Sequence, residues 1–356
     1  MGVFDRMAAM GHEQVVFCCD PDTGLRAIIA FHDTTRGPGL GGTRMLPYPD
    51  EEAALEDALR LSRGMTYKSA AVDVDFGGAK CVVIGDPHRD KTPELMRALG
   101  RFVEGMRGRL YTGTDVGTYP EDFVHSARES RFIVGLPVEY GGSGDSSVPT
   151  AFGVYMGMRA VARHLWGAED LAGRTVAIQG VGKVGAKLAR ELAADGARLV
   201  IADVDGAAVE RTAAETGAQV VDAQAVFDVE CDIFAPCALG GVLNDDTIPR
   251  LRCRAVAGSA NNQLAEERHG LELHRRGILY APDYIINAGG LIQVADELHP
   301  HGPNPERVRH RTQAIYDILL LIFRRSVELG VPTSEAADRL VEERIARTFR
   351  LKRIRT

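Results

Sequence analysis

The spacing of apolar residues changes along this chain, and the change predicts two structural parts. In the first part, apolar and β-branched runs at residues 15–19 and 25–31 flank a turn signal at residues 21–24, which predicts a β-hairpin. Apolar residues at helical spacing predict a helix that Asp50 caps and that ends near Gly64. A buried strand at residues 81–84 and a helix from Thr92 to about residue 105 complete this part.

The second part has a strand–helix–strand rhythm. After a helix at residues 150–165, helices at residues 183–194 and 207–216 alternate with short apolar strands. Those strands are expected at residues 175–179, 198–202, 219–221, 233–235, 255–257 and 278–280. This order is typical of a Rossmann-type, doubly wound parallel sheet. The chain is therefore expected to be an α/β protein, with an N-terminal α/β catalytic domain followed by a Rossmann-type domain.

Two long amphipathic helices end the chain, at residues 306–329 and 334–348. The last has no place in the sheet, so we expect it to pack back on the first domain. The predicted domains are residues 1–135 with 331–356, for catalysis and oligomerisation, and residues 136–330, for cofactor binding. A flexible polar run, GGSGDSS at residues 141–147, lies near their boundary.

Composition narrows the function. The 356 residues carry a formal net charge of −7, which argues against nucleic acid as the main partner. No run of about 18 apolar residues predicts a membrane span, and no signal-peptide pattern is evident. The six cysteines lack CxxC spacing and are expected to be reduced thiols in a cytoplasmic protein. The ten histidines form no metal-binding pattern, so no metal site is predicted.

A glycine motif predicts a dinucleotide site. It follows the predicted strand at residues 175–179 and comprises Gly180, Val181, Gly182, Lys183, Val184 and Gly185. Its first glycine allows a tight turn, its second lets the backbone approach a pyrophosphate, and its third permits close helix–strand packing. Asp203 ends the next strand, 23 residues after Gly180. A carboxylate there accepts hydrogen bonds from ribose hydroxyls and repels a 2′-phosphate, so NAD is favoured over NADP.

Three ionisable residues in the first part stand among glycines instead of other charges. Lys68 lies in GMTYK (residues 64–68), Lys80 in GGAK (residues 77–80), and Asp115 in TGTDVGT (residues 112–118). Two ammonium groups brought together depress each other's pKa and suit a site that holds a carboxylate and polarises a carbonyl. Asp115 would then be the general acid/base. The alternative interpretation is two lysines that reach solvent and an aspartate that caps a turn.

Several motifs resemble the NAD-dependent amino-acid dehydrogenases, the family of leucine, valine, phenylalanine and glutamate dehydrogenases. The motifs are GGTR (41–44), GMTYK, GGAK, TDVGT (114–118), APCA (235–238), GSANNQL (258–264), YAPDY (280–284) and NAGG (287–290). The resemblance covers roughly residues 12–345 and implies reversible oxidative deamination of an L-amino acid to a 2-oxo acid and ammonia. It also implies a homo-oligomer assembled through the first domain.

By position, the resemblance implies that Lys68 binds the substrate α-carboxylate and that Lys80 hydrogen-bonds the carbonyl oxygen or the catalytic water. Asp115 would shuttle protons. Asn262 would lie near the substrate amino group and the nicotinamide ribose, and Thr150 near the carboxamide. Gly41 would belong to the substrate site.

The side-chain pocket of the family corresponds to Leu40, Gly113, Leu291 and Val294. None of these residues can pair with a γ-carboxylate, which argues against glutamate as the substrate. Glycine at 113 leaves room for a flat ring, whereas alanine would narrow the pocket, so phenylalanine is favoured over leucine or valine. Two remoter alternatives are an NAD-dependent 2-hydroxy-acid dehydrogenase and a non-catalytic NAD-sensing protein. The first lacks a histidine in a comparable glycine-rich setting, and the second would not need the Lys–Lys–Asp set.

Overall fold

The computed structural model describes residues 2–353, which divide into two compact units. Within the described residues, unit 1 contains the chain up to Gly144, the segment Val294–Asn304, and the chain from Val341 onward. Unit 2 contains Asp145–Gln293 and Pro305–Leu340. No helix among the described residues is long and apolar enough to cross a membrane.

The unit boundaries differ from the expected ones at 135/136 and 330/331. The segment after residue 135 stays with unit 1, where Leu136 packs against the core that contains Ile133. Glu297 accepts hydrogen bonds from the backbone N–H of Gly135 at 2.8 Å and of Ser143 at 2.9 Å. These bonds join Val294–Asn304, which was expected in the second domain, to unit 1.

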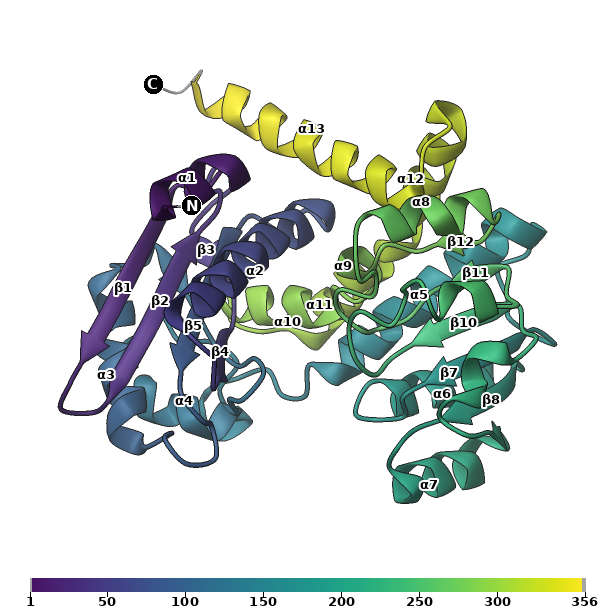
Figure 1. Cartoon of the computed structure of the whole chain (residues 1–356), viewed down its shortest axis with the longest axis horizontal. Helices are drawn as coiled ribbons and strands as arrows, with labels where there is room; N and C mark the ends of the chain where they lie inside the picture. The colour runs from purple at the N-terminus through teal and green to yellow at the C-terminus, as the bar shows by residue number, and fades with distance from the viewer. Residues whose placement is uncertain (1, 354–356) are drawn as a thin grey trace. The chain divides into compact units, whose positions relative to one another are not determined.

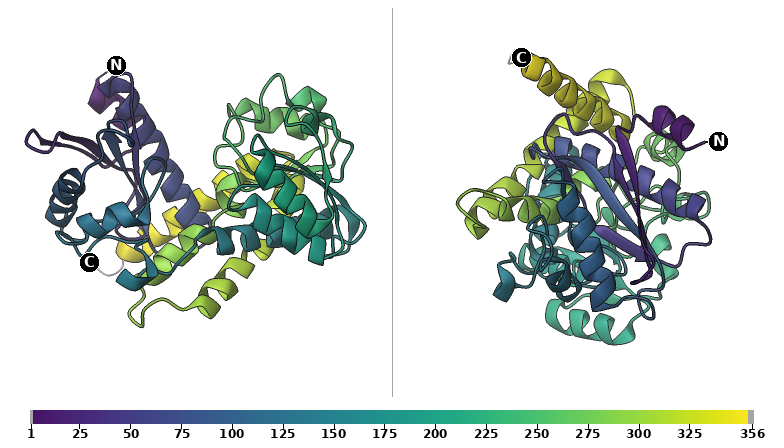
Figure 2. Two further views of the ribbon diagram at one scale, coloured as in Figure 1. Left: turned by 90° about the horizontal axis from the view of Figure 1, so that it is seen from below. Right: turned by 90° about the vertical axis from the view of Figure 1, so that its left-hand side faces the viewer.

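Unit 1 is built on a mixed sheet with strand order β1-β2-β5-β3-β6, in which β4 also pairs with β5 (Figure 1). The β1/β2 and β2/β5 pairs are antiparallel, and β5/β3, β3/β6 and β4/β5 are parallel. Its elements up to Gly144 are α1 (Val3–Met10), β1 (Gln14–Asp20), β2 (Leu25–Phe31), β3 (Gly39–Leu40), β4 (Thr43–Leu46), α2 (Glu51–Ala71), β5 (Gly77–Ile84), α3 (Pro93–Gly105), β6 (Leu110–Tyr111) and α4 (Pro120–Ser126). The predicted hairpin is confirmed as β1 and β2 (Figure 2).

Strand β2 is buried on both faces because the sheet of unit 1 carries a core on each side. Leu25, Ile29 and Phe31 pack in one cluster with residues of α3, while Ile28 and Ala30 pack in another with residues of α2. Helix α2 therefore lies directly against the centre of the sheet.

Unit 2 contains a parallel six-stranded sheet with strand order β12-β11-β10-β7-β8-β9, which confirms the doubly wound fold. Its strands are β7 (Thr175–Gln179), β8 (Arg198–Ala202), β9 (Gln219–Val220), β10 (Ile233–Pro236), β11 (Ala255–Val256) and β12 (Leu279–Tyr280). Its helices include α5 (Ser147–Trp166), α6 (Gly185–Ala194), α7 (Gly206–Thr216), α8 (Arg268–Arg275), α9 (Asp283–Ile286), α11 (Pro305–Gln313) and α12 (Ile315–Leu329). Helices α10 (Gly289–Glu297) and α13 (Thr333–Arg353) each contribute residues to both units.

The later part of α13 packs on unit 1, as expected from the sequence. Arg344 donates hydrogen bonds to the carbonyl oxygens of Ala70 and Ala71, at 3.0 and 2.6 Å. Those carbonyls belong to the last turn of α2, where that of Ala70 also accepts the N–H of Asp73 at 3.3 Å, so Arg344 of α13 adds to the C-terminal capping of α2.

Several predicted boundaries are wrong, among them that of α13, which runs to Arg353 and not to residue 348. Helix α2 continues past Gly64 to Ala71, because Thr66, Ser69 and Ala70 are buried and their packing outweighs the cost of one glycine. Strand β5 begins at Gly77, four residues before the expected start. The helix expected at residues 306–329 is two helices, interrupted where the N–H of Ala314 bonds to the carbonyl of Arg311, three residues back.

Candidate active site

Close backbone packing in unit 1 brings the candidate catalytic residues together, and three glycines permit it. A Cβ on Gly78 would lie 2.2 Å from Thr66 Oγ1 and 2.3 Å from the carbonyl oxygen of Ser62, so only glycine lets β5 approach α2 this closely. A Cβ on Gly41 would lie 1.8 Å from the carbonyl oxygen of Ala79, and one on Gly42 would lie 2.3 Å from that of Thr114. The segments that carry Lys68, Lys80 and Asp115 therefore converge.

Lys80 and Asp115 form a buried ion pair. Lys80 lies on β5 with 5 % of its side chain exposed, and Asp115 lies in the loop after β6 with 17 % exposed. The Lys80 Nζ donates a hydrogen bond to Oδ2 of Asp115. Burial, the positive charge of Arg44 and then that of Lys68 lower the pKa of Lys80 to about 7, while Asp57 opposes the shift. This lysine can therefore gain and lose a proton near neutral pH.

The loop that carries Asp115 is fixed from both sides. The N–H of Asp115 donates to Thr118 Oγ1 at 3.0 Å, and that hydroxyl donates to the carbonyl of Thr43 at 2.9 Å. Lys91 donates to the carbonyl of Gly117 at 3.0 Å. Gly117 has a φ of +80° and approaches β4 so closely that a Cβ would lie 2.1 Å from the carbonyl of Met45. The Asp115 carboxylate is thus held in one place.

Three residues next to this pair were not predicted from the sequence as site residues: Arg44, Asp57 and Tyr48. Arg44 on β4 lies 3.0 Å from Asp57 Oδ2 and 3.4 Å from Asp115 Oδ1. Tyr48 donates to the same Asp57 oxygen at 2.6 Å. Two features of the sequence could have indicated these residues. Arg44 ends the GGTR motif, and Asp57 precedes Lys68 by 11 residues, a spacing that places Asp57 and Lys68 on one face of α2.

Lys68 lies in the last turn of α2, half-buried, and its charge reaches Lys80. Leu40, 2 % exposed, ends β3 and pairs with Gly78 on one side and Tyr111 on the other. Gly41 directly follows Leu40, so both lie beside the segment that carries Lys80. Val294 also belongs to unit 1, on α10.

Gly113 lies in the segment between β6 and Asp115, and its missing side chain points at the protein backbone. A Cβ there would lie 2.3 Å from the carbonyl oxygen of Val134. Alanine at 113 therefore requires Val134 to move, so close backbone packing, and not pocket volume alone, favours glycine at this position.

The glycine loop and Asp203 belong to unit 2, at the carboxyl ends of the neighbouring parallel strands β7 and β8. Gly180 follows β7 with a φ of +98°, and a Cβ on it would lie 2.7 Å from the backbone nitrogen of Ala238, after β10. A Cβ on Gly185 would lie 1.9 Å from the carbonyl of Gly180, whereas Gly182 is exposed with nothing within 4 Å of its Cβ position. The tight turn, the open approach at Gly182 and the start of α6 at Gly185 fit a pyrophosphate, with Val181, Lys183 and Val184 completing the loop.

Asp203 follows β8 and is held facing this loop. Its Oδ2 accepts the N–H of Val181 at 2.7 Å, and its Oδ1 accepts the N–H of Asp205 at 3.0 Å. Each carboxylate oxygen retains a further lone pair for a ribose hydroxyl.

Thr150, Asn262 and Leu291 also lie in unit 2. Thr150 is in the first turn of α5, where its hydroxyl donates to the carbonyl of Ser146 at 2.8 Å. Asn262 is exposed and has a φ of +51°, a conformation that non-glycine residues seldom adopt. Leu291 is buried on α10.

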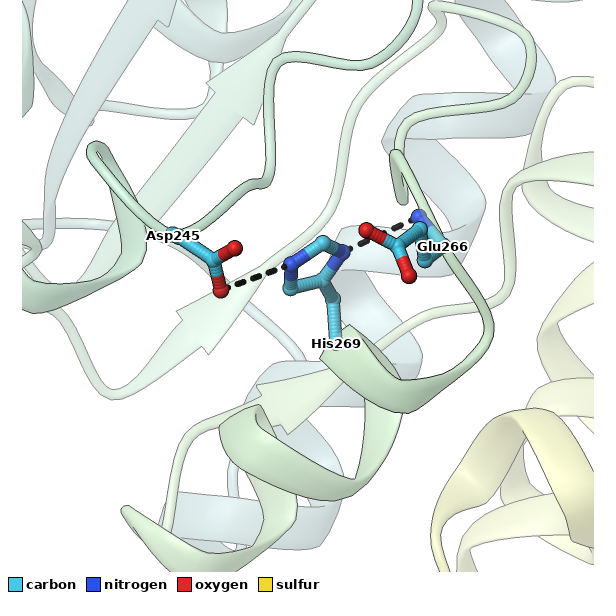
Figure 3. A group of neighbouring side chains, drawn as sticks. All are labelled: Asp245, Glu266 and His269. Atoms are coloured by element: carbon cyan, nitrogen blue, oxygen red, sulfur yellow. Dashed lines mark hydrogen bonds and ion pairs between the residues drawn. The ribbon is translucent and has the colours of Figure 1, made fainter.

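A cluster of Asp245, Glu266 and His269 in unit 2 has ligand atoms close enough to hold a metal ion (Figure 3). The buried His269 uses both ring nitrogens: Nδ1 accepts the N–H of Glu266 at 3.0 Å, so Nε2 carries the proton and faces Asp245 at 3.2 Å. Arg268 pairs with Asp245 at 2.5 Å and with Glu266 at 2.9 Å. The cluster is therefore explained by hydrogen bonds and ion pairs that fix the start of α8.

All six cysteines are free thiols, as expected. Cys18, Cys81, Cys231 and Cys253 are buried, and burial raises the pKa of each thiol. Neutral buried thiols of this kind serve packing and not nucleophilic chemistry.

Comparison with known proteins identifies the family. Residues 12–134 match the model described as "Glu/Leu/Phe/Val dehydrogenase, dimerisation domain", and residues 141–213 and 202–302 match "Glutamate/Leucine/Phenylalanine/Valine dehydrogenase". The chain is 58% identical over 354 residues to a phenylalanine dehydrogenase of Thermoactinomyces intermedius, which covers 99% of this chain and 96% of the relative. It is 52% identical over 344 residues to a leucine dehydrogenase of Bacillus cereus, and this match covers 97% of this chain and 93% of the relative.

Among solved structures, L-tryptophan dehydrogenase from Nostoc punctiforme superimposes with a TM-score of 0.87 at 45% identity, over 98% of this chain and 99% of that one. The chain therefore belongs to the Glu/Leu/Phe/Val dehydrogenase family.

Proposed function

We propose that this protein catalyses the reversible NAD-dependent oxidative deamination of an apolar L-amino acid to its 2-oxo acid and ammonia, with L-phenylalanine favoured. The observation that carries the proposal is the buried Lys80–Asp115 pair, whose lysine has a pKa of about 7. Membership of the family argues against the two alternatives, a 2-hydroxy-acid dehydrogenase and a non-catalytic NAD-sensing protein.

The residues of unit 1 would bind the substrate and move its protons. The Lys68 ammonium would hold the α-carboxylate. Neutral Lys80 would take a proton at Nζ from the water that attacks the iminium carbon and would then hydrogen-bond the new carbonyl oxygen. Asp115 would carry protons to and from the departing amino group. Their fixed positions mean that little reorganisation is needed during these transfers.

The cofactor would bind to unit 2 and, when bound, accept hydride from the substrate Cα. The glycine loop from Gly180 to Gly185 and the start of α6 would hold its pyrophosphate, and Asp203 would hold the adenosine ribose. The negative charge of Asp203 favours NAD over NADP. Thr150 and Asn262 would contact the nicotinamide end.

Phenylalanine is favoured on two grounds. Four relatives named phenylalanine dehydrogenase are 55–58% identical to this chain, and four named leucine dehydrogenase are 51–52% identical to it. In addition, the four positions that the resemblance assigns to the side-chain pocket, Leu40, Gly113, Leu291 and Val294, are all apolar or lack a side chain. Leucine or valine remains the alternative substrate, since one methylene in such a pocket discriminates only about 10–200-fold.

The protein would assemble as a homo-oligomer through unit 1. The matched model for residues 12–134 is described as a dimerisation domain. Strand β1 is at the end of the sheet order and exposes Phe17, so it presents an edge to a second copy. Mass measurement by light scattering tests this assembly; a monomer at micromolar concentration would contradict it. Location in the cytoplasm stays a prediction.

The reaction is tested by the initial rate of NAD reduction at alkaline pH with L-phenylalanine, L-leucine, L-valine and L-glutamate in turn. We expect the highest kcat/KM with L-phenylalanine and no measurable rate with L-glutamate. Equal inactivity with all four would contradict the proposed function. A clear preference for leucine or valine would contradict only the choice of substrate.

A further inference from the structure

Arg44 lies between two carboxylates that differ in their surroundings. On one side, its Nη1 lies 3.0 Å from Oδ2 of Asp57, whose other partners are Tyr48 at 2.6 Å and Arg60 at 2.8 Å. Although burial raises the pKa of Asp57, the hydrogen bonds of Tyr48 and Arg60 and the charge of Arg44 hold that pKa below its usual value. Asp57 is thus a fixed anion on α2 that anchors the guanidinium.

On the other side, Arg44 contacts only one oxygen of Asp115. Its Nε and Nη2 both lie 3.4 Å from Oδ1, which also accepts the N–H of Val116 at 2.5 Å. The second oxygen, Oδ2, is left to Lys80. A guanidinium suits this task because its donors form a rigid fork that can serve two acceptors at once.

From this arrangement we propose that Arg44, anchored by Asp57, is a positioning residue that fixes Oδ1 of Asp115 and thereby points Oδ2 at Lys80. The inference rests on the proposed function, since it assigns Arg44 a part in that reaction. Arg44 has 17 % of its side chain exposed and Lys80 has 5 %, so solvent screens their mutual repulsion only weakly.

The titratable and charged groups around Lys80 come from four elements, and they make the proposal testable by pH. Arg44 on β4 and Lys68 on α2 favour the neutral amine, whereas Asp57 on α2 favours the ammonium. The thiol of Cys81 on β5 has a pKa raised to about 12, so it carries no charge near neutral pH. Asp115, in the loop after β6, also favours the ammonium through its ion pair. Loss of the Arg44 charge should raise the pH at which Lys80 is half-protonated, while loss of the Asp57 charge should lower it.

The test compares Arg44→Met, Arg44→Lys and Asp57→Asn with the parent enzyme. For Arg44→Met we expect kcat to fall on the order of a hundredfold, because Asp115 loses its orientation. The acidic limb of the kcat/KM profile should also move up, by about 1 pH unit, because loss of the Arg44 charge outweighs the weakening of the Asp115 pair, whose loop stays fixed by Thr118 and Lys91. Arg44→Lys should return the limb to its parent position and recover part of kcat. Asp57→Asn should move the limb down.

Arg36→Met is the matched control. Arg36 is another shielded arginine of unit 1, 8 % exposed, and it pairs with Asp73 and Asp75, away from Lys80. We expect it to lower the melting temperature and leave the pH profile unchanged. An Arg44→Met enzyme with the parent kcat, or with lost activity and an unmoved limb, would overturn the proposal.

A readout without turnover separates this inference from the proposed function. The rate at which acetic anhydride labels Lys80, followed by mass spectrometry across pH, reports the protonation of that amine in parent and Arg44→Met alike. A midpoint that does not move would overturn the role of Arg44 even in an inactive protein. Movement of the midpoint without activity toward any of the four amino acids would contradict the proposed reaction and leave the effect of Arg44 on Lys80 standing.

Discussion

Lys68 and Lys80 carry the same functional group in different settings, and their chemistry differs accordingly. Lys80 lies on a central strand with 5 % of its side chain exposed, and burial is the main cause that lowers its pKa to about 7. Lys68 is half-buried at the end of α2 and supplies a positive charge to its surroundings. The first can exchange protons near neutral pH, and the second can hold an anion.

This difference predicts opposite results for one substitution at the two positions. Lys80→Arg keeps a charge that cannot be given up, so kcat should fall roughly 10²- to 10⁴-fold. Lys68→Arg keeps the charge that its role needs, so it should change mainly KM. Steady-state kinetics with L-phenylalanine, with circular dichroism to verify folding, checks both. A Lys80→Arg enzyme with nearly the parent kcat would show that Lys80 moves no proton.

Two of the catalytic candidates could be predicted from the sequence because a charged residue flanked by glycines and apolar residues is unusual. Lys80 and Asp115 stood among glycines, and the glycines proved to be the points of closest backbone approach. Arg44 and Asp57 were not identified as site residues, because a charged residue on a strand or a helix is ordinary until its partners are known. The partners come from β4, α2 and the loop after β6, which are distant in the chain.

At the scale of elements, the contact of α2 with β5 positions both lysines. Gly78→Ala would place a Cβ 2.3 Å from the carbonyl oxygen of Ser62, so we expect a loss of about 1–3 kcal/mol in the free energy of unfolding and a drop in kcat.

Gly64→Ala, on helix α2, is the control for Gly78→Ala. Gly64 is exposed with nothing within 4 Å of its Cβ position, and alanine there should stabilise the protein by about 0.5–1 kcal/mol. Urea denaturation measures both variants. Equal effects would contradict the importance of the close approach at Gly78.

Helix α2 is also joined to the sheet through buried histidines. His32 Nδ1 accepts the hydroxyl proton of Thr66 at 2.9 Å, while Nε2 donates to the carbonyl of Met10 at 3.1 Å. Burial, with the nearby charge on His12, lowers the pKa of His32 from 6.5 to about 4. The unfolded chain therefore binds more protons than the folded chain between these two values.

The resulting prediction is a loss of stability in mild acid. The contribution of neutral His32 is fully present above pH 6.5 and is lost as the pH falls from 6.5 toward 4. His32→Gln should make the urea midpoint less dependent on pH in this window, whereas His274→Gln, at an exposed position, should not. If the midpoint of the parent is constant from pH 7 to pH 4.5, His32 is not buried in its neutral form.

Element types were predicted better than element ends. The parallel sheet of unit 2 followed from alternating apolar runs and a glycine motif, both of which are local signals. The continuation of α2 past Gly64 and the early start of β5 depend on burial against each other, which no local pattern of either segment contains.

At the scale of the whole molecule, the proposed function assigns proton transfer to unit 1 and cofactor binding to unit 2. The Lys80–Asp115 pair and its arginine lie in unit 1, and the glycine loop with Asp203 lies in unit 2. The expected boundary at residue 135 missed the bonds of Glu297 to Gly135 and Ser143, because these bonds join segments more than 150 residues apart. A mutation in unit 1 should therefore abolish proton transfer and leave cofactor binding unchanged.

Asp115→Asn tests this account most directly, since asparagine has nearly the same shape but cannot carry a proton in its place. The measurement pairs NADH binding, followed by fluorescence, with the rate of L-phenylalanine oxidation. The account predicts NADH affinity equal to that of the parent and a turnover reduced by roughly 10²- to 10⁴-fold. Turnover within a few-fold of the parent would contradict the assignment of the Lys80–Asp115 pair as the proton-transfer centre.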